Sequence, residues 1–66
     1  MKNRQAEAVY IEGLKNFPNS EQLNYDAAYF YIQAERKENA LVYIRKLKML
    51  NPSNPDYAEM FKMLGP

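Results

Sequence analysis

The chain has 66 residues, a mass of 7.8 kDa and a formal net charge of +1, so it has the size of one small domain and not of two. It contains no Cys, His, Trp or Thr, and its two serines are Ser20 and Ser53. Zinc sites depend on Cys and His, and nucleophilic catalysis needs a Ser, Cys or Thr beside a base. We therefore expect a protein that is not an enzyme and that holds no metal ion and no cofactor.

Nucleotide-binding loops and membrane segments are also missing from the sequence. The two glycines, Gly13 and Gly65, stand too far apart to build a phosphate-binding loop. The longest apolar run, residues 27–32, is far below the roughly 20 residues of a membrane span, and residues 1–10 have no signal-peptide core. We expect a soluble chain without membrane contact. The lack of cysteine slightly favours the cytoplasm but leaves the compartment open.

Prolines and polar residues divide the chain into four segments with helical periodicity and no strand-like alternation. The first segment covers residues 3–16. Its apolar residues recur at i, i+3, i+4, i+7, i+8 and i+11, which places them on one helical face. They are Ala6, Val9, Tyr10, Gly13, Leu14 and Phe17.

The second segment, residues 20–34, begins with Ser20 as the expected N-cap and Glu21 in the first turn, where a carboxylate complements the helix dipole. Two apolar stripes leave a thin polar strip between them. One stripe contains Leu23, Ala27, Phe30, Tyr31 and Ala34, and the other contains Tyr25, Ala28, Tyr29 and Ile32. A helix with this pattern is expected to be covered on both sides.

The third segment, residues 36–50, has a single apolar face and is expected to be covered on one side. That face contains Ala40, Tyr43, Ile44, Leu47 and Leu50. The short link between the second and third segments predicts an antiparallel helical hairpin.

The fourth segment, residues 55–64, has Asn54 as its expected N-cap and Pro55 at the first helical position. Its apolar stripe contains Tyr57, Met60, Phe61 and Leu64. The sequence therefore predicts an all-α fold, an antiparallel stack of helical hairpins built from about four helices.

Pro18 and Pro52 lie 34 residues apart, and an alanine followed by a large apolar residue precedes each at the same offsets. A period of 34 is that of one helix-turn-helix unit of the tetratricopeptide repeat, with the pattern W-x2-L-G-x2-Y, A-x3-F and P. With the same spacing, that pattern falls on Asn24, Ala27, Ala28, Tyr31, Ala40, Ile44 and Pro52. The chain thus resembles the tetratricopeptide repeat family.

The resemblance implies a solenoid fragment with one complete repeat at residues 20–53. Residues 3–16 would be the second-type helix of a partial repeat, and residues 55–64 a first-type or capping helix. Asn24 stands in place of the family's aromatic residue and Ala27 in place of its leucine, so we expect a weaker core there. Leu47 stands where the family favours a small residue.

Proteins of this family are scaffolds that bind peptides or protein surfaces on a concave face. The resemblance places nine residues of this chain on that face: Gln22, Tyr25, Asp26, Tyr29, Gln33, Asp56, Glu59, Met60 and Met63. Their aromatic and mildly acidic character implies an apolar or basic protein or peptide as the partner. The alternative is that the tyrosines and methionines bury one another or a neighbouring copy. The basic residues with which some members of the family bind C-terminal carboxylates are missing here.

By the same resemblance the chain begins in the middle of a repeat, and an apolar face of the first segment remains open. We expect association between copies, with the first segment of one copy against the fourth segment of another. Two origins remain open: a piece of a longer repeat array, or a chain that completes its stack with itself.

Besides partner binding and self-association, a third candidate function is binding of nucleic acid. It would use a basic cluster in and beside the third segment. The cluster contains Arg36, Lys37, Arg45, Lys46 and Lys48. No aromatic residues alternate with these cations, and the net charge is only +1, so we expect a solvated outer face instead.

Overall fold

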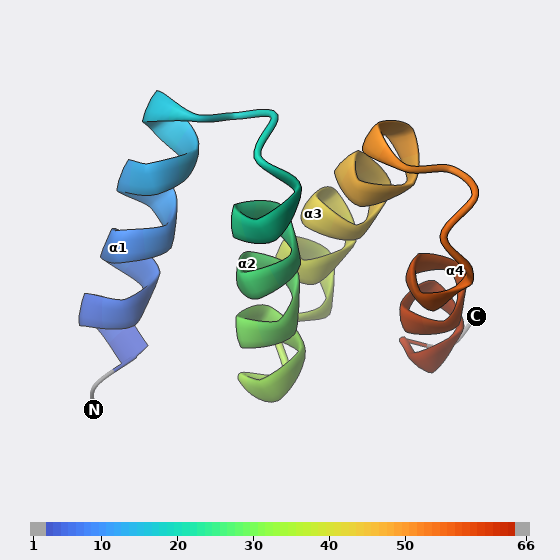
Figure 1. Cartoon of the computed structure of the whole chain (residues 1–66). Helices are drawn as coiled ribbons and strands as arrows, with labels where there is room; N and C mark the ends of the chain where they lie inside the picture. The colour runs from blue at the N-terminus through green and yellow to red at the C-terminus, as the bar shows by residue number, and fades with distance from the viewer. Residues whose placement is uncertain (1–2, 65–66) are drawn as a thin grey trace.

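The computed structural model of the protein describes residues 3–64, and these form four α-helices and no β-strand (Figure 1). The helices are α1 (Asn3–Asn16), α2 (Glu21–Gln33), α3 (Lys37–Leu50) and α4 (Pro55–Met63). The prediction of an all-α stack of antiparallel hairpins is confirmed. The first helix has the expected bounds, and the others begin or end within one residue of them.

The starts of α2 and α4 are fixed by the two predicted N-caps. The hydroxyl oxygen of Ser20 accepts a hydrogen bond of 3.2 Å from the backbone N–H of Leu23. The side-chain oxygen of Asn54 accepts one of 2.9 Å from the N–H of Asp56, with Pro55 in the first turn. Each cap satisfies a backbone donor that the helix itself leaves unpaired.

The turn between α2 and α3 depends on a left-handed residue. Glu35 has a φ of 59°, and its N–H donates to the carbonyl of Ile32 while the N–H of Arg36 donates to that of Tyr31. These two bonds form the Schellman motif, in which glycine is the usual residue at the left-handed position. The hairpin is therefore closed by a residue whose side chain disfavours this conformation.

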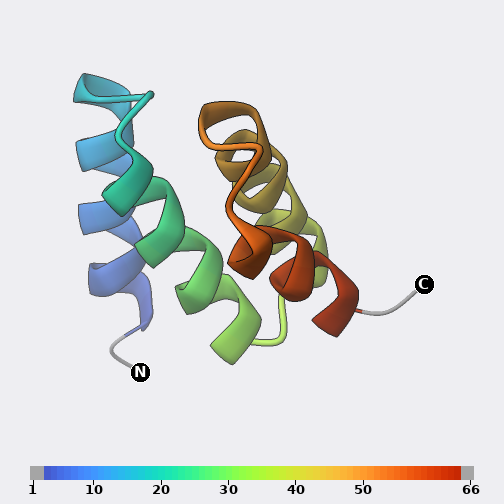
Figure 2. The same ribbon diagram turned by 45° about the vertical axis from the view of Figure 1, so that its right-hand side comes forward.

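The core lies between α2 and α3 and extends to α4. Figure 2 shows α4 packed alongside α3. Ala28 and Ala40 are fully buried, so the helices of the hairpin approach closely. Among the described residues, eight apolar side chains are buried: Ala27, Ala28, Tyr31, Ala40, Ile44, Leu47, Tyr57 and Met60. In contrast, α1 packs mainly against α2 and has no buried residue among those described.

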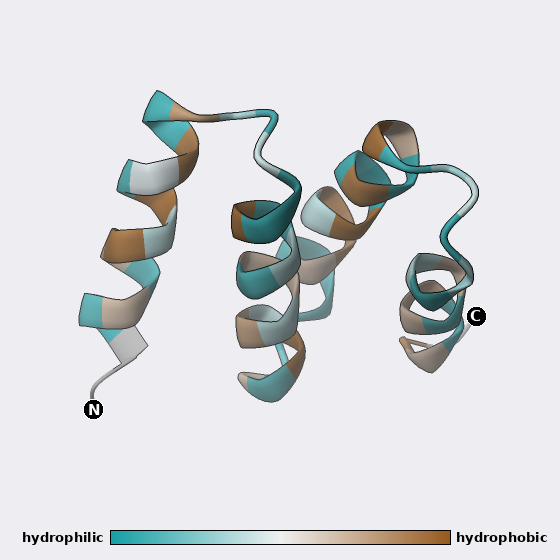
Figure 3. Ribbon diagram, in the orientation of Figure 1, coloured by the Kyte–Doolittle hydropathy of each residue, from teal (hydrophilic) through white to brown (hydrophobic). Residues whose placement is uncertain are grey.

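The apolar stripe expected on α1 is covered only in part. Tyr10 and Leu14 are partly covered, whereas Val9 and Phe17 are exposed. A Cβ atom added to Gly13 would lie 3.2 Å from a methyl carbon of Leu23, which shows how closely α1 and α2 approach there. Because a single neighbouring helix covers only a narrow stripe, the edges of the apolar face stay in solvent. Figure 3 shows apolar segments on α1 as well as on the central hairpin.

Asn24 is buried and hydrogen-bonded at the position where a weaker core was expected. Its side chain is only 2% exposed, and its amide nitrogen donates to the carbonyl oxygens of Pro18 at 3.1 Å and Ser20 at 2.8 Å. The buried amide thus satisfies backbone acceptors in the loop between α1 and α2.

Within residues 3–64, no helix has the length and apolar character that crossing a membrane requires.

Candidate functional site

The outward side of α2 carries five of the nine predicted binding residues. Gln22, Asp26, Tyr29 and Gln33 follow one another at i, i+4, i+7 and i+11, and Tyr25 lies beside them one turn before Tyr29. Tyr29 is 50% exposed, and the amide nitrogen of Gln22 donates to the Asp26 carboxylate at 2.9 Å. We call these five residues the tyrosine face.

An open hollow of about 360 Å³ lies along the tyrosine face where α1 meets α2. Its lining is mostly aromatic and comprises Tyr10, Tyr25, Asp26, Tyr29, Phe30 and Gln33. The rings of Tyr25 and Tyr29 are 6.3 Å apart between centroids, and those of Tyr10 and Phe30 are 5.4 Å apart. Four aromatic rings beside one carboxylate and one amide form a surface suited to an apolar side chain or a cation.

A second hollow continues from the tyrosine face toward α4. Glu21, Gln22, Tyr25 and Tyr57 line it, and the rings of Tyr25 and Tyr57 are 6.3 Å apart. Tyr25 therefore borders both hollows, which makes α2 the common wall of a surface that reaches from α1 to α4.

The Glu21 carboxylate fixes the far wall of the second hollow. It accepts a short hydrogen bond from the Tyr57 hydroxyl and one of 3.1 Å from the amide nitrogen of Asn51. The bond from Tyr57, followed by that from Asn51, lowers the pKa of Glu21 below its ordinary value. Burial, together with the bond to Glu21, raises the pKa of Tyr57 to about 12. Glu21 is thus a carboxylate that joins α2 to the end of α3 and to α4.

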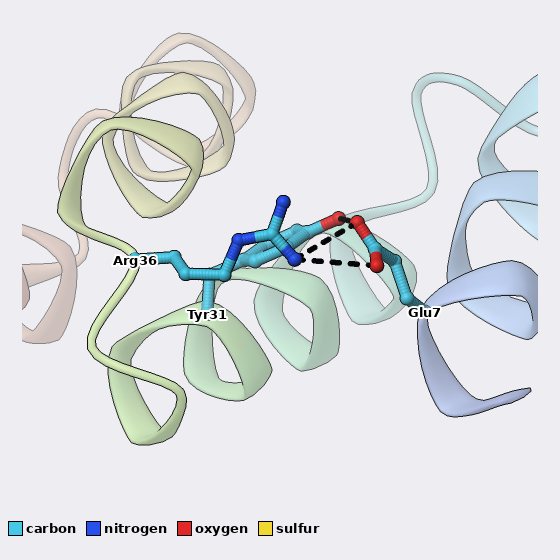
Figure 4. A network of polar contacts seen from close by, with 3 residues as sticks. All are labelled: Glu7, Tyr31 and Arg36. Carbon is cyan, nitrogen blue, oxygen red and sulfur yellow. Dashed lines mark hydrogen bonds and ion pairs between the residues drawn. The ribbon is translucent and has the colours of Figure 1, made fainter. Parts of the chain in front are cut away.

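A similar contact joins α1 to the central hairpin (Figure 4). The Tyr31 hydroxyl donates to Glu7 at 2.8 Å, and the Arg36 guanidinium contacts both Glu7 oxygens at 3.2 and 3.3 Å. The same guanidinium lies over the Tyr31 ring, 5.1 Å from its centroid. The bond from Tyr31 and the charge of Arg36 lower the pKa of Glu7, while burial and the bond to Glu7 raise the pKa of Tyr31 to about 12.

The four predicted residues of α4 do not share one position. Asp56 and Glu59 are exposed on α4. Met63, also exposed, lines a separate hollow that it shares with Arg36 at the end of the α2–α3 hairpin. Met60 is only 8% exposed and packs in the core, so it presents no surface to a partner. The sequence pattern places Met60 both on the apolar stripe of the fourth segment and on the binding face. The structure places it in the core with Tyr57 of the same stripe.

The basic cluster is not one continuous patch. Arg36 contacts Glu7, and the Lys48 ammonium lies 4.8 Å from the centroid of the Phe61 ring. Arg45 is exposed on the outer side of α3, and Lys46 borders a hollow with Leu14, Pro18, Asn24, Val42 and Tyr43. Arg36 and Lys48 are thus committed to contacts within the chain.

The sequence did not point to Tyr10, Phe30 or Tyr57 as walls of these hollows. All three belonged to the predicted apolar stripes, and an aromatic ring at the edge of a stripe can be half covered and still line a surface. The pairing of Tyr57 with Glu21 had no signal in the sequence, because the two residues are 36 positions apart.

No family model, no curated protein and no solved structure matches this chain. Within residues 3–64, no group of three or more His, Cys, Asp or Glu side chains is placed to hold a metal ion.

Proposed function

We propose that the protein is a non-catalytic interaction module of tetratricopeptide type, which binds a peptide or protein segment across its tyrosine face. The observation that carries this proposal is the half-exposed ring of Tyr29, which stands beside Tyr25 and Asp26 on the wall of an open hollow. Tyrosine is enriched at binding hot spots because it offers a rigid apolar ring and a hydroxyl together.

The repeat arrangement itself is supported by the packing of the hairpin. Ala28 and Ala40, the small residues of the repeat pattern, are fully buried, and Tyr31 and Ile44 fill the core beside them. Pro52 lies two residues after Leu50, the last residue of α3, where the pattern ends the second helix of a repeat.

The charge of the surface favours a partner with basic and apolar residues. Glu21 and Asp26 are the charged residues of α2, and Asp56 and Glu59 add two carboxylates on α4 against one cation, Lys62. An acidic ligand would meet like charges, whereas a lysine or arginine could contact Asp26 and the face of a tyrosine ring.

The test is a calorimetric titration with two synthetic peptides that share their apolar residues and carry either lysines or glutamates. We expect the lysine peptide to bind and the glutamate peptide not to bind. Tyr29→Ala should weaken binding of the lysine peptide by about tenfold, as truncation of an aromatic anchor costs more than about 1 kcal/mol.

The matched control is Ile11→Ala, because Ile11 is 47% exposed on α1 and lines none of the hollows of the tyrosine face. It should leave the affinity unchanged. Equal affinity for the two peptides, or equal loss in the two variants, would contradict the proposal.

A further inference from the structure

A second outward stripe lies on the opposite side of the hairpin. Val42, Arg45 and Met49 follow at i, i+3 and i+7 on α3, and Val42 and Met49 are 57% and 76% exposed. We call these three residues the α3 stripe. Because α2 and α3 bury facing surfaces against each other, the tyrosine face and the α3 stripe point away from the hairpin on opposite sides, with α2 in front of α3 in Figure 1.

The two helices of the hairpin carry opposite net charge. The residues of α2 include two carboxylates and no cation, whereas α3 has four cations and one carboxylate, a net charge of +3. A chain whose net charge is +1 thus has an acidic helix and a basic helix back to back. Such a distribution orients copies of the molecule so that unlike sides meet.

The side chains of the two stripes are also complementary in kind. The tyrosine face has aromatic rings around one carboxylate, and the α3 stripe has two exposed apolar side chains around one guanidinium. Arginine stacks on tyrosine rings and pairs with carboxylates, and methionine sulfur packs favourably against aromatic rings. The α3 stripe therefore has the basic and apolar side chains that we expect in a ligand of the tyrosine face.

We propose that the partner of the tyrosine face is the α3 stripe of a second copy of this chain. This inference rests on the proposed function of the face and names its occupant. Arg45 of one copy lies against Asp26 of the next, and Val42 and Met49 cover the rings of Tyr25 and Tyr29. Since two different surfaces meet, the contact is heterologous. A pair of copies keeps one free tyrosine face and one free α3 stripe, so assemblies grow by addition of further copies.

The experiment is analytical ultracentrifugation of the intact chain over a range of concentrations, at low and at high salt. We expect a mean mass that rises with concentration at low salt and falls back when salt is added. Asp26→Lys and Arg45→Glu should each weaken association by roughly tenfold or more, because each replaces an attraction by a repulsion.

Mixing the two variants supplies the decisive measurement. The altered face of the Asp26→Lys chain is complementary to the altered stripe of the Arg45→Glu chain, so an equimolar mixture should associate more strongly than either variant alone. Glu12→Lys and Lys15→Glu make the same changes in net charge at exposed positions of α1, and both should associate like the unaltered chain.

Three results would overturn the inference: an unaltered chain that stays monomeric at low salt, variants that associate normally, or a mixture that stays monomeric. The second result would place self-association elsewhere, for instance between α1 and α4. In each case, binding of the lysine peptide and its loss in Tyr29→Ala would show that the proposed function stands without this partner.

Discussion

The two outer helices are attached to the same hairpin in different ways. The shorter helix, α4, inserts Tyr57 and Met60 into the core, whereas the longer helix, α1, has no buried residue among those described. Each is nevertheless joined to the hairpin by a tyrosine that donates to a glutamate. The comparison shows that the longer helix is not the one that buries more: α4 places two side chains in the core and α1 places none of those described.

The two tyrosine–glutamate pairs also differ in the third side chain that contacts the glutamate. The Glu7–Tyr31 pair includes the charged Arg36, which is about half exposed, while the Glu21–Tyr57 pair includes the neutral amide of Asn51. An exposed ion pair between two charged groups is screened by salt, and hydrogen bonds from neutral donors to a carboxylate are affected less. We therefore expect α4 to unfold together with the hairpin and α1 to open separately and more easily.

The largest expected effect comes from truncating one apolar residue in each outer helix. Met60→Ala should lower the free energy of unfolding by about 2–5 kcal/mol, because it leaves a cavity in the core. Leu14→Ala should cost less than about 2 kcal/mol, because Leu14 is only partly buried and water can fill the space. Urea denaturation followed by circular dichroism measures both values. Equal costs would mean that α1 belongs to the core as fully as α4 does.

The second prediction concerns pH. The pKa values of Glu7 and Glu21 are lowered by folding, so their contribution to stability is present above their ordinary value of 4.5 and is lost as the pH falls below it. The pKa values of Tyr31 and Tyr57 are raised, so the contribution of these residues is present below pH 10 and is lost as the pH rises toward about 12.

The measurement is the free energy of unfolding as a function of pH in the unaltered chain and in Tyr31→Phe and Tyr57→Phe. Each variant should be less stable at neutral pH, and each should lose less stability between neutral and alkaline pH, since one ionisable hydroxyl is gone. An unchanged alkaline slope in both variants would refute the assignment of these pKa shifts.

The third prediction separates the two polar contacts by their charge. Hydrogen exchange of the α1 amides should become faster in high salt, because screening weakens the Glu7–Arg36 pair, while exchange of the α4 amides should change little. Arg36→Gln should speed exchange in α1 at low salt and remove most of its salt dependence. If α1 and α4 respond alike to salt, the difference between the two contacts has no effect on how the helices are held.

The sequence predicted those parts of the fold that depend on neighbouring residues. Ser20 and Asn54 cap their helices because a side chain beside a free N–H needs no distant partner. The buried role of Asn24 escaped prediction, since the Pro18 carbonyl that it binds comes into reach only when the loop before α2 folds over the side chain. For the candidate site, the resemblance to the repeat pattern placed five residues on α2, and they lie near one another on its outward side. Met60 instead lies in the core, because the position of α4 depends on tertiary packing.

The smallest expected effect tests whether both outer helices share the stability of the hairpin. Glu35→Gly should raise the free energy of unfolding by about 1 kcal/mol, because glycine removes the strain of the left-handed turn. Glu38→Gly, three residues later in the first turn of α3, should lower it by about 0.5–1 kcal/mol, since glycine weakens a helix.

Native-state hydrogen exchange then distinguishes the two outer helices, α1 and α4. In Glu35→Gly the α4 amides should gain protection together with the hairpin, while the α1 amides, which exchange through separate opening, should not. A gain of equal size in α1 would show that α1 opens only when the whole chain unfolds, and the contrast between the two outer helices would then be one of burial alone.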